Sequence, residues 1–295
     1  MWDWPQGRRQ SRVRKRSPAA VVITGASSGL GEALALEYAQ PGHTLGLIAR
    51  DRTRLEAVAA RCSCKGARCE IASMDVTDWD ALQHWMVAFD AMRPIDLLFV
   101  NAGVFSGHGP DRQIESIEEV LWQIRVNLEG ALLTIAAALP GMRRRRTGRI
   151  VLIGSLAALQ PLADAPGYSA SKAGLMSYGE ALREYLAPEG VSVSLVYPGY
   201  IQTQQTAHHI GPLPLKRSPA RAAATIRAHV DRGRSFIAFP LTLLLLLRLG
   251  RLIGWRLRAA LGRSLRFYTD KQPDLGTQAK RYSDLRTSKI TRKVA

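Results

Sequence analysis

Short apolar runs alternate with helical patterns along most of this chain, and no other feature limits its fold so strongly. The runs fall at residues 19–23, 45–49, 70–74, 95–100, 149–154, 191–197 and 235–239. Most of them are almost continuously apolar, as in strands buried on both faces. Helical patterns lie between them, at 32–40, 51–61, 78–92, 114–142, 168–187 and 219–232. This alternation predicts an α/β fold, with one parallel sheet covered by helices on both faces.

A glycine-rich turn follows the first predicted strand. Its sequence, TGASSGLG, places Gly25, Gly29 and Gly31 between that strand and a helix. Glycines let the backbone turn sharply and approach a diphosphate, and the start of a helix offers free N–H groups and the positive end of its dipole. Glycine spacing alone is a weak signal, but the strand–turn–helix context is the one that the motif requires. We therefore predict a doubly wound, Rossmann-type domain that binds a dinucleotide.

Arg50 directly follows the second predicted strand, at the position where NAD-selective sites place an acid for the ribose 2′-hydroxyl. An arginine fork suits a 2′-phosphate instead, so the sequence favours NADP(H), with NAD(H) as the alternative. In the competing interpretation, Asp51 caps the next helix and Arg50 points into solvent, which leaves the cofactor preference open.

Further motifs follow the turn in order. They are Asp75-Val76, Asn101-Ala102-Gly103, Asn127, Ser155, Tyr168-x-x-x-Lys172 and Pro198-Gly199-x-Ile201-x-Thr203. Through these motifs and their spacing, residues 19–240 resemble the short-chain dehydrogenase/reductases. One departure is Val100, which stands where the family usually has another asparagine.

The resemblance implies a set of cofactor contacts. It places Asp75 and Val76 at the adenine, and the segment that begins at Pro198 beside the nicotinamide. The full implied set is Gly25, Ser27, Ser28, Gly29, Leu30, Gly31, Arg50, Asp75, Val76, Asn101, Ala102, Gly103, Tyr168, Lys172, Pro198, Gly199, Ile201 and Thr203.

Tyr168 and Lys172 lie four residues apart, so on a helix they share a face. An unperturbed phenol has a pKa of about 10, and we expect the Lys172 ammonium to lower the pKa of Tyr168. Tyr168 could then act as general acid/base, while Ser155 donates a hydrogen bond to the developing oxyanion. The resemblance implies that Lys172 also binds the nicotinamide ribose and that Asn127 supports a proton relay.

These residues predict an oxidoreductase that interconverts a carbonyl and an alcohol. The segments expected beside the substrate, 156–159 and 162–165, are mostly apolar, which favours a small lipophilic substrate. The alternative is a non-catalytic dinucleotide-binding regulator or scaffold of the same fold. The intact set of Ser155, Tyr168 and Lys172 argues against it, because a pure binder has no need of a tuned phenol.

Basic residues gather at the two ends of the chain, whose net charge is +17. Residues 1–18 hold six Lys/Arg and one acid, and residues 248–295 hold thirteen and three. Within 248–266, the arginines fall on one side of a helical projection and most of the leucines on the other, with Leu252 and Trp255 among the arginines. This pattern predicts a basic amphipathic helix, which either lies on an anionic membrane or packs on its own domain or on a subunit partner. We divide the chain into a flexible arm (1–18), a catalytic domain (19–240) and an extension (241–295).

The rest of the sequence narrows the partners and the compartment. Charge confined to the ends, without a helix-turn-helix, zinc or RNA-binding signature, argues against a specific nucleic-acid partner. Cys62, Cys64 and Cys69 lack a fourth ligand at zinc spacing, so we predict no metal site. No apolar stretch follows the basic N-terminus. We expect a cytoplasmic protein, peripheral to the inner face of a membrane if the extension binds one, and the resemblance implies a homodimer or homotetramer.

Overall fold

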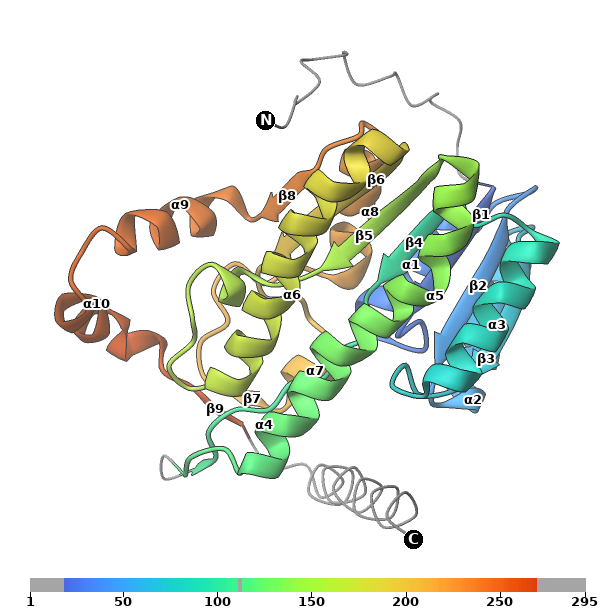
Figure 1. The fold of residues 1–295 in the computed structure, drawn as a ribbon. Helices are drawn as coiled ribbons and strands as arrows, with labels where there is room; N and C mark the ends of the chain where they lie inside the picture. Colours follow the sequence, from blue (N-terminus) through green and yellow to red (C-terminus); the bar gives the residue numbers. More distant parts are fainter. Residues whose placement is uncertain (1–18, 111–112, 270–295) are drawn as a thin grey trace, which may run out of the picture.

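The computed structural model describes residues 19–110 and 113–269. Seven parallel strands form one sheet in the order β3-β2-β1-β4-β5-β6-β8 (Figure 1). The strands are β1 (Ala20–Thr24), β2 (Thr44–Ala49), β3 (Arg68–Ser73), β4 (Leu97–Val100), β5 (Gly148–Ile153), β6 (Val191–Pro198) and β8 (Phe236–Phe239). The order reverses between β1 and β4, which creates the crevice where open α/β sheets bind their ligands. The predicted Rossmann-type single domain is confirmed.

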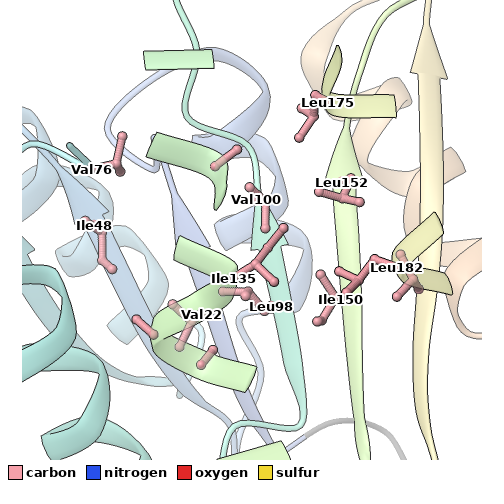
Figure 2. Packing of buried hydrophobic residues seen from close by; sticks show 14 of the residues in the cluster. Val22, Ile48, Val76, Leu98, Val100, Ile135, Ile150, Leu152, Leu175 and Leu182 are labelled. Carbon is pink, nitrogen blue, oxygen red and sulfur yellow. The ribbon is translucent and has the colours of Figure 1, made fainter. Parts of the chain in front are cut away.

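Helices cover both faces of this sheet. One face carries α1 (Gly29–Tyr38), α2 (Arg52–Ser63) and α8 (Pro219–Val230). The other carries α3 (Trp79–Met92), α4 (Ile117–Ile124), α5 (Gly130–Arg145) and α6 (Pro166–Leu186). Alternate residues of each strand point to opposite faces. Figure 2 shows Val22, Leu98 and Ile150 on the second face, packed with Ile135 of α5 and Leu182 of α6.

The long helical region predicted at 114–142 is divided in the structure. A five-residue π-helix, Arg125–Glu129, separates α4 from α5. The sequence did not predict this π-helix, because one widened turn hardly changes the spacing between apolar residues along a helix. Most other predicted elements agree with the structure to within two or three residues.

The chain after β8 forms an arm that leaves the helical layers (Figure 1). It contains α9 (Leu241–Gly250) and α10 (Trp255–Leu261) and ends in β9 (Tyr268–Thr269). Strand β9 pairs antiparallel with β7 (His209–Ile210), which follows the short helix α7 (Gln204–Ala207). The continuous helix predicted at 248–266 is therefore wrong, because α9 ends at Gly250 and α10 begins only after Gly254.

The described residues can also be compared with the expectations for a membrane, a metal site, the cysteines and the two chain ends. Within the described ranges, no helix has the length and apolar character needed to cross a membrane, and no three His, Cys, Asp or Glu side chains could hold a metal ion. Cys62, Cys64 and Cys69 are free thiols near the end of α2 and the start of β3. The arm predicted at 1–18 and the tail at 270–295 lie outside the described residues.

Candidate active site

A large open cavity, about 2500 Å³ in volume, lies at the carboxyl ends of the strands. Residues that directly follow β1, β2, β3, β4, β5 and β6 line it, among them Gly25, Arg50, Asp75, Asn101 and Ser155. All the implied cofactor contacts lie on the cavity wall. Of the four proposed catalytic residues, Ser155, Tyr168 and Lys172 line the cavity, and Asn127 lies buried behind it.

The glycine-rich turn has the geometry of a diphosphate cradle. Gly25 and Gly29 have positive φ angles of 68° and 58°, which L-residues with side chains rarely adopt. A Cβ on Gly31 would lie 2.0 Å from the Gly25 carbonyl oxygen, so no side chain fits there. Helix α1 begins at this turn, and its N-cap Ser28 makes no side-chain capping bond. The N–H groups at the start of α1 therefore suit an anion in the cavity.

Asn101 braces the same turn from the neighbouring strand. Its Nδ2 donates to the backbone oxygens of Thr24 and Gly25, at 2.9 and 3.3 Å. The Thr24 hydroxyl accepts from the backbone N–H groups of Asn101 and Ala102, at 3.0 and 3.1 Å. This network ties the ends of β1 and β4 together and fixes the turn at the point where the strand order reverses.

Both interpretations of Arg50 and Asp51 find support. Asp51 caps α2, because its side chain accepts from the Arg54 N–H at 3.0 Å. The half-exposed Arg50 nevertheless borders the cavity, with its Nη1 3.9 Å from Asp75 Oδ2. Arg54 is a second cation on this wall, donating to Gln204 Oε1 at 2.7 Å. Sequence analysis missed Arg54, although its place one turn after Arg50 was a usable signal.

Tyr168 lies in the first turn of α6, and its hydroxyl hydrogen-bonds with Ser155 at the end of β5. Phe105 packs edge-on against the Tyr168 ring, with the centroids 4.9 Å apart. One turn along α6, Lys172 donates from Nζ to the Ile153 oxygen at 2.9 Å, and its Nζ lies 5.8 Å from the Tyr168 ring centroid. The structure thus brings all three side chains to one place.

The expected tuning of Tyr168 by Lys172 is not what the structure shows. Burial raises the pKa of Tyr168 to about 12, and the hydrogen bond with Ser155 offsets this only in part. Burial also lowers the pKa of Lys172 to about 8. Burial disfavours the charged form of each group and is the largest cause of both shifts. The free phenol is therefore protonated at neutral pH.

Asn127 sits inside the π-helix and is fully buried. Its Oδ1 accepts from the Val104 N–H at 2.7 Å, and its Nδ2 donates to the Val104 oxygen at 2.9 Å and to Ser171 Oγ at 3.0 Å. A Cβ on Gly103 would lie 3.2 Å from Asn127 Oδ1 and 3.4 Å from Lys172 Nζ. Asn127 and Lys172 therefore approach the same face of Gly103.

An aromatic wall formed by Phe105, His209 and Phe267 borders the cavity near Tyr168. His209 stacks on Phe267 with centroids 4.1 Å apart, and Phe267 lies 6.2 Å from Phe105. Arg266 holds this wall in place by pairing with Asp164 at 2.5 Å. The sequence did not predict Phe267 or Arg266 as site residues. Only the tertiary fold brings them next to His209 and Asp164, which lie more than 50 positions earlier in the chain.

Comparisons with known proteins agree with this geometry. The family model described as short chain dehydrogenase matches residues 19–210. An uncharacterized oxidoreductase of Myxococcus xanthus is 35% identical over 255 residues, covering 86% of this chain and 100% of its own. A 3-dehydrosphinganine reductase of Arabidopsis thaliana is 39% identical over 183 residues, covering 60% of this chain and 54% of its own. A solved short-chain dehydrogenase from Sphingobium yanoikuyae in complex with NADPH has a TM-score of 0.68 at 28% identity, covering 79% and 94% of the two chains.

Proposed function

Because this chain belongs to the short-chain dehydrogenase family, we propose that it reduces the carbonyl group of a lipophilic substrate to an alcohol with NADP(H). That it is an oxidoreductase follows from its relatives. The observation that carries the finer proposal is the meeting of Tyr168, Ser155 and Lys172 in the cavity that also holds the glycine-rich turn. A non-catalytic regulator would have no use for a buried phenol paired with a serine.

The cavity residues fit a nicotinamide dinucleotide. The turn from Gly25 to Gly31 suits the diphosphate, Arg50 suits a ribose 2′-phosphate, and Lys172 suits the hydroxyls of the other ribose. When bound, the nicotinamide supplies the hydride for reduction. The protein's task is to orient the substrate and to manage the proton.

Tyr168 is the proposed proton donor. Its raised pKa keeps the hydroxyl protonated at neutral pH, and a phenol remains a stronger acid than the alcohol that forms. As negative charge develops on the substrate oxygen, Tyr168 can give up its proton, and Ser155 can hydrogen-bond to the same oxygen. Lys172 lies one helical turn from Tyr168, with its Nζ 5.8 Å from the ring centroid, and is the proposed source of the proton that restores the phenol.

The substrate side of the cavity supports a lipophilic substrate. Its wall includes Phe105, Leu156, Leu162, Leu246 and Phe267. The similarity to a 3-dehydrosphinganine reductase favours a ketone that carries a long apolar chain. The chain spans about half the length of that reductase, so the apolar cavity wall is the main support for this substrate class.

We expect Arg50→Asp to reverse the cofactor preference. Losing a charge-assisted bond to the 2′-phosphate, and adding a like charge, should lower kcat/KM for NADPH by about 10- to 100-fold. The value for NADH should stay constant or rise. The measurement is consumption of each cofactor in the presence of lipophilic ketones, by the wild type and the variant.

Arg52→Asp is the matched control, since Arg52 pairs with Glu56 on the surface and does not line the cavity. An equal loss with both cofactors in Arg50→Asp would refute the role assigned to Arg50. Binding of NADPH without its consumption, across the whole ketone series, would instead favour the non-catalytic regulator.

A further inference from the structure

The outer face of α9 consists of leucines that no described part of the chain covers. Leu244 is buried, and Leu243 and Leu247 pack against the main apolar cluster. On the opposite side of the helix, Leu241, Leu245, Leu246 and Leu249 are 65%, 59%, 64% and 62% exposed. A helix that is apolar all round is normally buried on all sides, so this face suits contact with another apolar phase.

The exposed apolar surface continues beyond α9. Leu252 in the connecting turn is 83% exposed, and Trp255 and Leu257 of α10 are 68% and 55% exposed. Contiguous exposed apolar surface of this kind marks an interaction site on a folded protein. Trp255 adds an indole, a group that favours the boundary between water and lipid. We call residues 241–263 the apolar arm.

The charge of the arm indicates which partner covers it. Residues 241–263 include Arg248, Arg251, Arg256, Arg258 and Arg263, and no acid. Arg248 and Arg256 lie over the rings of Phe236 and Trp255. Within the described ranges, no carboxylate forms an ion pair with these five arginines. A second copy of the chain would bring a matching set of arginines to a two-fold interface, whereas anionic lipid headgroups would neutralise them.

The arm also forms part of the cavity wall. Leu246, Leu247, Ile253, Trp255 and Arg258 line the same cavity as Tyr168. Leu246 and Trp255 belong both to the exposed apolar surface and to the cavity wall, so the two surfaces adjoin on an element that stands away from the helical layers in Figure 1. A membrane that meets the exposed leucines would therefore lie next to the cavity that contains Tyr168.

We propose that the apolar arm docks the enzyme on an anionic lipid bilayer, with its exposed leucines and Trp255 in the acyl boundary and its arginines at the phosphates. The substrate class is then a ketone lipid taken from that bilayer. The docking rests only on the arm's surface, and the substrate class rests in addition on the proposed carbonyl reduction.

The test is flotation of the full chain with vesicles of phosphatidylcholine alone and with added phosphatidylserine. We expect binding to the anionic vesicles that weakens as salt rises. The pair Leu245→Ser/Leu249→Ser, which lies outside the cavity wall, should reduce the partition coefficient by at least about tenfold. The pair Arg256→Gln/Arg263→Gln should reduce binding to the vesicles that contain phosphatidylserine by about tenfold. Its binding to phosphatidylcholine vesicles should not change.

Matched controls come from other exposed surfaces. Val87→Ser/Met92→Ser on α3 removes similar apolar area, and Arg232→Gln/Arg234→Gln removes similar charge, so neither pair should change flotation. An unchanged melting temperature shows that each variant is folded. Flotation of the leucine pair at the wild-type level would overturn the docking proposal. The proposal would also be overturned if the wild type did not float and instead self-associated in a way that Leu245→Ser/Leu249→Ser abolished.

The docking and the chemistry can fail separately. If the wild type floats but consumes no NADPH with any ketone, the proposed function is wrong and the docking stands. If it reduces a water-soluble ketone but never floats, the docking is wrong and the proposed function stands.

Discussion

Replacing Tyr168 with Phe is expected to lower kcat for ketone reduction by about 10²- to 10⁴-fold, the usual contribution of a positioned general acid. The variant removes the hydroxyl that bonds with Ser155 and keeps the ring that packs edge-on against Phe105. The affinity for NADPH should therefore change little. The measurements are steady-state NADPH consumption with a lipophilic ketone, and a fluorescence titration of NADPH binding.

Tyr178→Phe is the matched control for this variant. Tyr178 lies on the same helix, is 38% exposed and does not line the cavity, so its hydroxyl should not affect turnover. Wild-type turnover in Tyr168→Phe would show that another group protonates the substrate. Loss of NADPH affinity together with turnover would mean that Tyr168 supports the cofactor site rather than the proton transfer.

The second large effect is expected at the glycine-rich turn. An added methyl group in Gly31→Ala would lie 2.0 Å from the Gly25 oxygen and 2.6 Å from Asn101 Nδ2. The first contact is with backbone, so the turn must open and the N–H groups at the start of α1 must shift. Overpacking of this kind costs about 1–3 kcal/mol, and we expect NADPH to bind about 10- to 100-fold more weakly.

The control for Gly31→Ala is Gly254→Ala, where nothing lies within 4 Å of the added methyl group. It should bind NADPH as the wild type does. Calorimetric titration of the folded variants measures the affinity directly. Wild-type affinity in Gly31→Ala would show that the dinucleotide does not rest on this turn.

The sequence predicted the sheet well because buried parallel strands leave a local signal. β4 is apolar throughout and β1 is apolar except for Thr24, and the turn after β1 contains the glycines that positive φ angles require. Most of the proposed site residues were identified through family motifs, many of which follow strand ends, while Tyr168 and Lys172 lie one helical turn apart.

Other features depend on contacts between distant segments, and sequence reasoning missed them. The pKa of Tyr168 is set by the tertiary packing around it, so the spacing to Lys172 predicted the wrong direction. Phe267 and His209 meet only because β9 pairs with β7. Gly250 ends α9 and Gly254 caps α10, so these two glycines flank the break between the helices. A helical projection assumes one continuous helix over 248–266 and therefore could not predict that break.

Deuterium transfer tests the central claim most directly. The enzyme is incubated with a long-chain ketone and NADPH that carries deuterium at the transferable position of the nicotinamide, and the product is examined by mass spectrometry. The account predicts an alcohol with deuterium on the former carbonyl carbon, formed by the wild type and nearly absent with Tyr168→Phe. Formation of the alcohol without deuterium, or binding of NADPH with no alcohol from any ketone tested, would contradict it.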